Sequence, residues 1–510
     1  MPQNLIEKAF LKPAESYWIA STPKTDYPTL QDNVKTDILV VGGGITGITT
    51  AYLLQKEGFD VVIIDTSRIA LSTSGHTTAK ITSLHDLKYA KLINQIGIEG
   101  AQKYGDINQN AISMIEELIS KNSIQCDFSR QPAYVYTQEE QYLDKIEKEI
   151  TAANSIGLPA SFKRELPLPL SVEGAICFEN QAQFHPRKYL LALAEVFVKN
   201  GGHIYENTTA IDIHENKECM TSTRNGFKVF SNKVIVASHF PFYDGGGFYS
   251  ARMYPDRSYL ISAKAPDKYE GGMYISYENP TRSIRFQPLD KEDQLILIGG
   301  EHHKTGQDSC EKEHYSNLIK FAELNFSAIE VPYRWSAQDY TAMNEIPFIG
   351  HITSGRENIF IATAFQKWGM TTGTVAAIVI KDIITNGKSE VEDIFKPSRF
   401  TPVASAKNFI KENLDVADNL ISGKLQSPPE KFSLELGEGK SVTVDGKLAG
   451  AYRDMDGNMY IVDTTCKHLG CEVHWNSAEK SWDCPCHASR YSYDGTVLEG
   501  PALKPLDRLR

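Results

Sequence analysis

Two short stretches near the C-terminal end combine cysteine with histidine, the side chains that bind zinc and iron–sulfur clusters. The first reads Cys-Lys-His-Leu-Gly-Cys from Cys466 to Cys471, and the second reads Cys-Pro-Cys-His from Cys484 to His487. Two loops of this kind can bring thiolates and imidazoles together around a metal centre. The spacing within each stretch differs from finger-type zinc patterns. At this point the ligands are consistent with either zinc or an iron–sulfur cluster.

A glycine-rich turn near the start of the chain has the spacing of a dinucleotide-binding site. Residues 37–65 read as an apolar strand, the turn Gly42-x-Gly44-x-x-Gly47, a helical pattern and a second strand that ends at Asp65. Gly42 permits the turn, Gly44 lets the backbone approach a pyrophosphate, and Gly47 lets the helix pack on the strand. The helix N-terminus attracts negative charge, and Asp65 can bind a ribose. This complete order favours a bound dinucleotide over an empty glycine turn.

Two later segments are expected to contact the same ligand. Residues 66–82 are rich in serine and threonine, which suits contacts to a phosphate or a polar ring edge, although a plain polar loop has the same composition. Residues 358–384 read as an apolar strand, a loop with Gly369 and Gly373, and a helix rich in small residues. That helix start would again direct amide donors at an electron-rich group. The ligand is therefore expected between two helix N-termini.

Composition and charge narrow the classes of function. The chain has 510 residues and a formal net charge of −11, which argues against non-specific binding to nucleic acid or to an anionic membrane. No apolar run is long enough to cross a bilayer, and the first residues lack the apolar core of a signal peptide. Four of the eight cysteines are scattered, as is typical of reduced cysteines in a cytosolic protein. We predict two or three domains and a cytoplasmic location.

The two cysteine and histidine stretches resemble the loops of the Rieske [2Fe–2S] domain, which read Cys-x-His-x-Gly-Cys and Cys-Pro-Cys-His. The resemblance implies that Cys466 and Cys484 bind one iron, and that His468 and His487 bind the other. Neutral imidazoles add less negative charge than thiolates, so such a cluster has a raised reduction potential.

The same resemblance assigns roles to neighbouring residues. Cys471 and Cys486 match the cysteines that form a disulfide in the subclass resembling cytochrome bc and b6f proteins. Ser489 and Tyr491 match hydroxyls that hydrogen-bond to cluster sulfurs in high-potential members and stabilise the reduced cluster. Ala488 departs from the glycine that is usual in the family, which is expected to shift the loop slightly without removing a ligand.

The larger part of the chain, residues 36–385, resembles the FAD-dependent oxidoreductases of the D-amino-acid oxidase, glycine oxidase and sarcosine oxidase type. Besides the fingerprint, the matching motifs are residues 77–79, 184–186, 339–350 and 369–373. A flavoprotein half followed by a Rieske module is similar to a bacterial family of fused FAD and Rieske proteins. FAD is favoured over a nicotinamide because the chain has only one dinucleotide fingerprint.

This resemblance implies an FAD site with the adenine beside residues 209–211 and the flavin ring beside residues 368–373. The expected FAD-binding residues are Gly42, Gly44, Ile45, Thr46, Gly47, Asp65, Thr77, Thr78, Ala79, Ala210, Ile211, Ala237, Gly369, Met370 and Thr371. No catalytic base can be named from the sequence. Arg257, Arg285, Tyr259 and His302 are weak candidates for substrate contacts, because arginine and hydroxyl donors can bind a carboxylate.

The expected fold class is an α/β, Rossmann-like FAD-binding domain with an inserted α+β substrate domain, followed by a small all-β Rieske domain. The expected boundaries are an N-terminal strap at 1–35, an FAD-binding domain at 36–90, 176–250 and 331–385, a cap domain at 91–175 and 251–330, a linker with a helix at 386–430, and a Rieske domain at 431–510.

The leading functional hypothesis is a dehydrogenase or oxidase that takes electrons from an amine or amino acid. The electrons would pass from FAD through the cluster to an external one-electron carrier or quinone-like acceptor. One alternative is a reductase in which a carrier feeds electrons through the cluster to FAD, a direction that a high-potential cluster opposes. Another is a redox-sensing or electron-transfer protein without an organic substrate.

Overall fold

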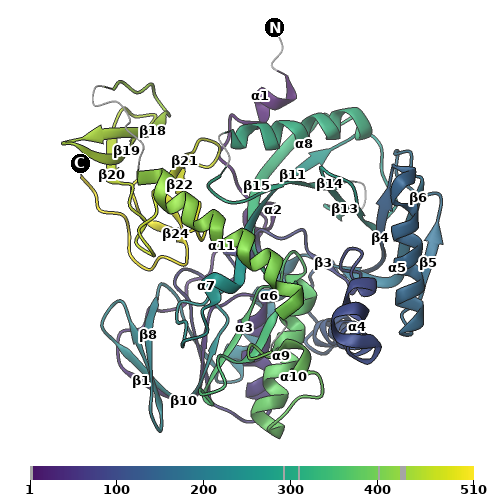
Figure 1. Cartoon of the computed structure of the whole chain (residues 1–510), viewed down its shortest axis with the longest axis horizontal. Helices are drawn as coiled ribbons and strands as arrows, with labels where there is room; N and C mark the ends of the chain where they lie inside the picture. Colours follow the sequence, from purple (N-terminus) through teal and green to yellow (C-terminus); the bar gives the residue numbers. More distant parts are fainter. Residues whose placement is uncertain (1–3, 291–292, 308–309, 400–401, 425–431, 510) are drawn as a thin grey trace.

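The structure is a computed structural model that describes residues 4–290, 293–307, 310–399, 402–424 and 432–509. Two large sheets form most of the molecule. In the view of Figure 1 the first sheet lies in the lower half and the second in the upper half. Two small sheets at the C-terminal end lie beside both of them (Figure 1).

The first sheet is built outward from the glycine fingerprint. Strand β1 (Val34–Val41) pairs in parallel with β2 (Val61–Ile64) on one side and with β10 (Lys228–Val236) on the other. The strand order is β16-β17-β10-β1-β2-β7, and β9 joins β8 to β10. The other strands are β7 (His203–Tyr205), β8 (Ala210–Glu215), β9 (Cys219–Thr223), β16 (Phe348–His351) and β17 (Ile359–Thr363). The predicted α/β class is confirmed.

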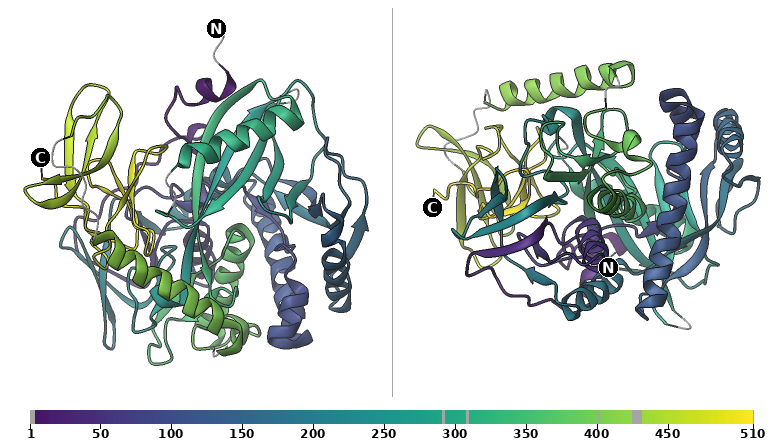
Figure 2. Two further views of the ribbon diagram at one scale, coloured as in Figure 1. Left: turned by 45° about the horizontal axis from the view of Figure 1, so that its top comes forward. Right: turned by 90° about the horizontal axis from the view of Figure 1, so that it is seen from below.

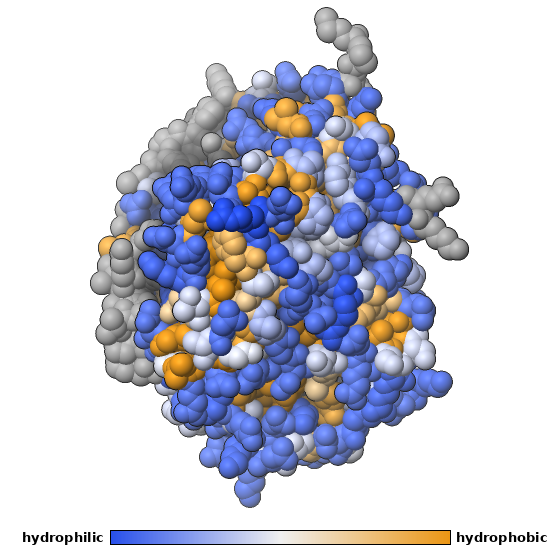
Figure 3. Space-filling view, turned by 90° about the vertical axis from the view of Figure 1, so that its right-hand side faces the viewer, coloured by the Kyte–Doolittle hydropathy of each residue, from blue (hydrophilic) through white to orange (hydrophobic). Residues whose placement is uncertain are grey.

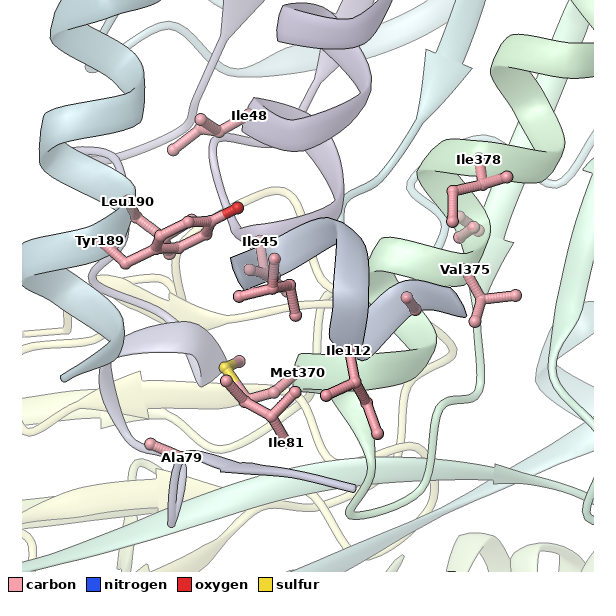
Figure 4. Close-up of a cluster of buried hydrophobic side chains, with 14 of the residues drawn as sticks. Ile45, Ile48, Ala79, Ile81, Ile112, Tyr189, Leu190, Met370, Val375 and Ile378 are labelled. Carbon is pink, nitrogen blue, oxygen red and sulfur yellow. The ribbon is translucent and has the colours of Figure 1, made fainter. Parts of the chain in front are cut away.

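Three helices pack together beside this sheet: α3 (Ile45–Lys56), α6 (Pro186–Lys199) and α9 (Gly369–Asn386). Figure 4 shows Ile45 of α3 between Tyr189 of α6 and Val375 of α9, in one buried apolar cluster. Most residues of α3 and α9 are buried, as expected for helices that are apolar on several faces. The two helix starts are therefore held at the same end of the sheet.

The second sheet is mainly antiparallel and forms a roof over the first domain. Its order is β15-β11-β14-β13-β12-β4-β6-β3, and β5 pairs with β6. Helix α8 packs on β11 and β14, and α5 packs on β5 and β6. The elements are β3 (Lys80–Ile81), α4 (Tyr89–Lys121), β4 (Ser129–Thr137), α5 (Leu143–Ser155), β5 (Ala160–Lys163), β6 (Gly174–Gln183), α7 (Tyr249–Arg252), β11 (Met253–Lys264), β12 (Met273–Ser276), β13 (Arg282–Pro288), β14 (Gln294–His303), α8 (Glu311–Phe326) and β15 (Glu330–Ala342).

Besides the short β3, two longer stretches that were expected in the FAD-binding domain belong to the roof sheet. These are residues 176–183, which form most of β6, and residues 331–342, which form most of β15. β15 pairs with β11 along its whole length, from Glu330 opposite Lys264 to Ala342 opposite Met253. A strand paired over that length stays in one sheet, so the chain returns to the first domain only after Ala342.

The C-terminal part contains two short sheets and a long helix. Strands β18–β20 and β21–β24 form the two sheets, and α11 (Pro402–Lys424) precedes them after the short α10 (Glu392–Phe395). Figure 2 shows α11 running from the small sheets along the edge of the larger domains. The strands are β18 (Gly439–Val444), β19 (Lys447–Arg453), β20 (Met459–Asp463), β21 (His474–Asn476), β22 (Ser481–Asp483), β23 (Arg490–Ser492) and β24 (Val497–Glu499).

The N-terminal segment, which was predicted as a strap, contacts the roof sheet through Glu15 and the first domain through Leu30. It holds α1 (Leu5–Ala9) and α2 (Tyr17–Ala20). Trp18 is fully buried, and its indole Nε1 donates a hydrogen bond of 2.7 Å to the carbonyl of Thr77. The strap therefore supports one of the loops that were expected to contact FAD.

Hydrophilic residues cover most of the face in Figure 3, and the hydrophobic residues there form separate patches. In the part of the chain that the structure describes, no helix combines the length and apolar character needed to cross a bilayer.

Candidate functional site

One large cavity of about 1430 Å³ lies where the two large sheets and the C-terminal module meet. Its volume exceeds the roughly 300–1,000 Å³ of pockets for drug-sized ligands. The walls include the glycine fingerprint, the loop at residues 72–78, the start of α9, the inner face of the roof sheet and residues 496–503. A cavity of this size and shape has room for a dinucleotide and for a small molecule beside it.

The fingerprint has the geometry that a dinucleotide requires. Gly42 has φ +114°, and a Cβ on Gly47 would lie 1.8 Å from the carbonyl oxygen of Gly42, so neither position tolerates a side chain. The Asp65 carboxylate accepts hydrogen bonds from the amides of Gly43 (2.7 Å) and Ser67 (2.8 Å). Burial raises the pKa of Asp65. These contacts hold the acidic residue at the edge of the glycine turn.

Most of the expected FAD-binding residues lie on this one cavity. Those that line it are Gly42, Gly44, Ile45, Thr46, Asp65, Thr77, Thr78, Ala210, Ala237, Gly369 and Met370. Gly47, Ala79, Ile211 and Thr371 do not line it. The Thr371 hydroxyl instead accepts a hydrogen bond of 2.9 Å from the amide of Thr82, and thereby fixes β3 to the first turn of α9. Ile211 is 40% exposed on the surface.

Of the four weak candidates for substrate contacts, two lie on the cavity wall and two do not. Tyr259 and His302 line the cavity, whereas Arg257 and Arg285 do not. The Arg285 guanidinium is buried and donates to the carbonyls of Ala79 (2.9 Å) and Phe184 (3.2 Å). In this arrangement it supports the loop before β3, and its charge does not face a substrate.

The other arginine, Arg257, belongs to a buried ionic cluster between the roof sheet and the C-terminal module. Its Nη2 lies 3.1 Å from Glu479, which also accepts from Arg490. Arg490 further pairs with Asp483 at 3.0 Å. Burial alone would raise the pKa of Glu479, but the two guanidinium groups hold it well below its usual range. This cluster, defined by Arg257, Glu479, Asp483, Arg490 and Glu499, joins the modules through charge.

The cysteine and histidine stretches form two ligand pairs. The thiols of Cys466 and Cys484 share a hydrogen bond, which lowers the pKa of Cys466 to about 6. The rings of His468 and His487 lie 5.0 Å apart between centroids. Burial lowers the pKa of both imidazoles to about 4, so they are in the neutral form that binds metal. Among the described residues no group hydrogen-bonds to the buried Nδ1 atom of His487, as expected of a nitrogen reserved for a metal.

The two remaining cysteines of these loops are joined to each other. Cys471 and Cys486 form a disulfide, as the resemblance implied. Their sulfurs also lie close to that of Cys484, but a bonded pair cannot supply thiolates. Two free thiols and two imidazoles, arranged as separate pairs, suit a two-iron cluster better than a single tetrahedral zinc.

Ala488, where the family usually has glycine, has a strained backbone conformation. Ala488 has φ +62°, in the left-handed region that favours glycine, so the family's usual residue would fit this turn with less strain. The carbonyl of Ala488 accepts a hydrogen bond of 3.0 Å from Gln338 of β15, which helps to hold the turn in place.

Replacing Tyr491 with phenylalanine is expected to lower the reduction potential of the cluster. The Tyr491 hydroxyl lies 3.3 Å from the sulfur of Cys466, and a hydrogen bond there stabilises the added negative charge of the reduced state. A hydrogen bond of about 1–1.5 kcal/mol corresponds to about 40–65 mV for one electron. A redox titration followed by electron paramagnetic resonance measures the shift. Tyr493→Phe is the matched control, because the Tyr493 ring packs on Tyr452; equal shifts in both variants contradict the assignment.

The histidine side of this centre faces the FAD-binding domain. Phe240, which follows β10, packs edge-on against the ring of His468 with centroids 6.1 Å apart. Tyr340 of β15 donates a hydrogen bond of 3.3 Å to the carbonyl of His487. Phe240 and Tyr340 both line the cavity. The two histidines predicted to bind metal therefore lie directly behind Phe240 and Tyr340 of the cavity wall.

The end of the chain also contributes to the cavity. Pro501, Ala502 and Leu503 line it near Thr209 and Ala210, where the adenine was expected. Arg224 donates a hydrogen bond to the carbonyl of Leu503 and fixes this segment to the first domain. The C-terminal module thus supplies one wall of the cavity.

Comparisons with known proteins agree with this geometry. The model of the family described as FAD dependent oxidoreductase (DAO) matches residues 37–383, which is more than half of the chain. The chain belongs to this family. A second family model, the Rieske [2Fe-2S] domain, matches residues 429–510. This oxidoreductase is therefore a flavoprotein that carries a Rieske domain, with FAD and a [2Fe–2S] cluster as its cofactors.

Individual relatives cover both parts of the chain. YhfW of Bacillus subtilis, named as a Rieske 2Fe-2S iron-sulfur protein, is 45% identical over 97% of this chain and 97% of its own length. Gamma-glutamylputrescine oxidoreductase of Escherichia coli is 24% identical over 74% of this chain and 91% of its own length. The glycine oxidase structure from Geobacillus kaustophilus superposes with a TM-score of 0.62 at 17% identity, over 72% of this chain and 100% of that chain, and so shows the fold.

Two charged residues of the cavity were not expected from the sequence. Asp339 lines it, and burial raises the pKa of this carboxyl to about 7. Lys80 also lines it and is almost completely buried. Lys80 stands inside the serine- and threonine-rich segment, where a lysine looks like an ordinary loop residue. Only the pairing of β3 with β6 shows that it faces the interior.

Proposed function

We propose that this flavoprotein oxidises an amine or an amino acid and delivers the electrons to an external one-electron acceptor through its Rieske domain. When bound, the flavin accepts a hydride and releases single electrons, and the cluster carries one electron at a time. The observation that carries the proposal is the shared cavity wall. Phe240 and Tyr340 line the cavity and also contact the two histidines of the Rieske loops.

The relatives support the substrate class. The names of two of them, a gamma-glutamylputrescine oxidoreductase and a glycine oxidase, describe oxidation of compounds that contain an amino group. The inner face of the roof sheet lines the cavity beside the fingerprint and can displace water from a substrate bound there. Such a site favours the neutral amine that hydride transfer requires.

Asp339 is the residue that we propose as the proton acceptor. An amine enters mainly as an ammonium ion at neutral pH and must lose a proton before oxidation. A carboxyl with a pKa of about 7 can take that proton and release it again near neutral pH. Lys367, which lowers the pKa of Asp339, is itself paired with Asp256 at 3.2 Å, so the electrostatic surroundings of the carboxyl are fixed.

An anaerobic absorbance titration of protein holding both cofactors tests the proposal. The titrants are amines, amino acids and N-methyl amines, with a reduced carrier protein in a parallel series. We expect one organic class to bleach the flavin band and then to reduce the cluster. If no organic compound reduces the flavin while the reduced carrier fills both centres, the protein is a reductase and the proposed direction is wrong.

A further inference from the structure

Lys80 is a buried cation without an anionic partner on the wall of the cavity. It is 7% exposed, and its ammonium donates hydrogen bonds to the carbonyl of Tyr274 (3.1 Å) and to the hydroxyl of Ser283. Both partners are neutral, and an ammonium has three donors. Among the described residues, no carboxylate forms an ion pair with Lys80, and the nearby charge that acts on it is the cation Arg285.

Such an arrangement is unfavourable without a ligand. Transfer of a charge into a protein interior costs several kcal/mol unless a counter-charge compensates it. Burial and Arg285 accordingly lower the pKa of Lys80. An anion that entered the cavity would remove this penalty and would occupy the third donor.

The place of Lys80 is fixed from several sides. Lys80 and Ile81 form β3, which pairs with β6 and is held to α9 by the bond between Thr82 and Thr371. Figure 4 shows Ile81 beside Met370 at the start of α9. Met370 borders the region expected for the flavin ring, so Lys80 stands where a substrate would lie against it.

The cavity has other cations nearby. Lys88 is also buried on its wall and donates to the Gln366 side chain at 3.0 Å; burial lowers its pKa to about 8 against the opposing effect of the Glu345 carboxylate. Arg257 is held by Glu479 and Glu499, and Lys367 is held by Asp256. Lys145 donates to the hydroxyl of Tyr277 and is a more exposed residue of the cavity rim. Unlike Lys88, Lys80 has no carboxylate among the described groups that act on its charge, and it is therefore the buried cation best placed to recognise a substrate anion.

We propose that Lys80 binds an anionic group of the substrate, most simply a carboxylate, so that the substrate is an amino acid or a related amino acid derivative and not a simple amine. This inference rests on the proposed function and makes it more specific. Ser283 and the carbonyl of Tyr274 orient the ammonium, and the carboxylate supplies the missing charge.

The test compares anthranilate with anthranilamide, its neutral counterpart, as ligands of the protein that holds both cofactors. Isothermal titration calorimetry gives the two dissociation constants. The wild-type protein is expected to bind the carboxylate more tightly, and Lys80→Met is expected to weaken carboxylate binding about 10- to 100-fold through loss of a charge-assisted hydrogen bond. Binding of the amide should change little. Lys145→Met is the matched control and should keep the preference.

Several results would overturn the proposal. A wild-type protein that binds neither compound, or binds both equally, has no anion site of this kind. A Lys80→Met variant that keeps full preference for anthranilate assigns the site to another residue. Flavin absorbance and the melting temperature show whether the variant is folded and loaded. Because the measurement is of binding, its outcome is separate from the anaerobic titration, which alone decides whether amines or amino acids reduce the flavin.

Discussion

Replacing His487 with alanine is expected to abolish the Rieske cluster while FAD stays bound. The imidazole of His487 is buried opposite His468, and we propose that these two side chains bind the same iron. Loss of one ligand leaves an open coordination position beside the cavity wall, and such clusters are then lost to solvent. Iron content should fall to near zero, and the Rieske electron paramagnetic resonance signal of the reduced protein should disappear.

The control is His474→Ala in the same module. His474 hydrogen-bonds to the carbonyl of Gly306 at 2.8 Å and is outside the proposed ligand set. The His474→Ala variant should keep full iron content. Both the His474→Ala and the His487→Ala variants should keep the flavin absorbance spectrum. A His487→Ala protein with normal iron and an unchanged signal would show that the ligands are assigned wrongly.

Replacing Glu479 with glutamine is expected to destabilise the docked C-terminal module strongly. The Glu479 carboxylate lies between Arg257 and Arg490 and also accepts a hydrogen bond of 2.9 Å from the Tyr315 hydroxyl. Glutamine is neutral, so the two buried guanidinium groups lose one compensating carboxylate. Removing one partner of a buried ion pair typically lowers the free energy of unfolding by about 3–5 kcal/mol. The urea midpoint of the module, followed by the visible circular dichroism of the cluster, should therefore fall.

The exposed pair of Glu438 with Lys440 provides the control for this experiment. Its ends lie 3.2 Å apart on the surface, and Glu438→Gln should change stability by less than about 0.5 kcal/mol. An equal midpoint for Glu479→Gln and wild type would mean that the ionic cluster does not hold the modules together.

The stabilisation that Glu479 provides should depend on pH in a direction that its pKa determines. The pKa of Glu479 is lowered in the folded protein, so its stabilisation is present above the unfolded pKa of about 4.3 and is lost as the pH falls toward the folded pKa. The difference in urea midpoint between wild type and Glu479→Gln should be full at neutral pH and should shrink below about pH 4.

Local motifs allowed much of the site to be predicted from the sequence. The turn from Gly42 to Gly47 and the loops at Cys466 and Cys484 are short, and the chemistry of each depends on residues close together in the chain. Long-range pairings were harder to predict. The partner of Arg257 is Glu479, which is 222 positions away, and so an arginine that looked free to bind substrate is neutralised by another module.

The sheet that each strand joins was also hard to predict from the sequence. β6 and β15 were expected in the FAD-binding domain, because nothing local in their sequences indicates which sheet they join. The pairing of β15 with β11 decides it, and that pairing is a property of the folded protein. Lys80 and Asp339 escaped notice for a related reason, since their burial depends on several elements at once.

The wall formed by Pro501, Ala502 and Leu503 implies an order of assembly during synthesis. The ribosome makes the glycine fingerprint before it makes residues 501–503, and domains of growing chains fold from the N-terminal side. The nascent protein therefore has a dinucleotide cavity with one side still open, and the finished protein closes that side with its own C-terminal segment. FAD that enters the open cavity is then enclosed when residues 501–503 dock against it.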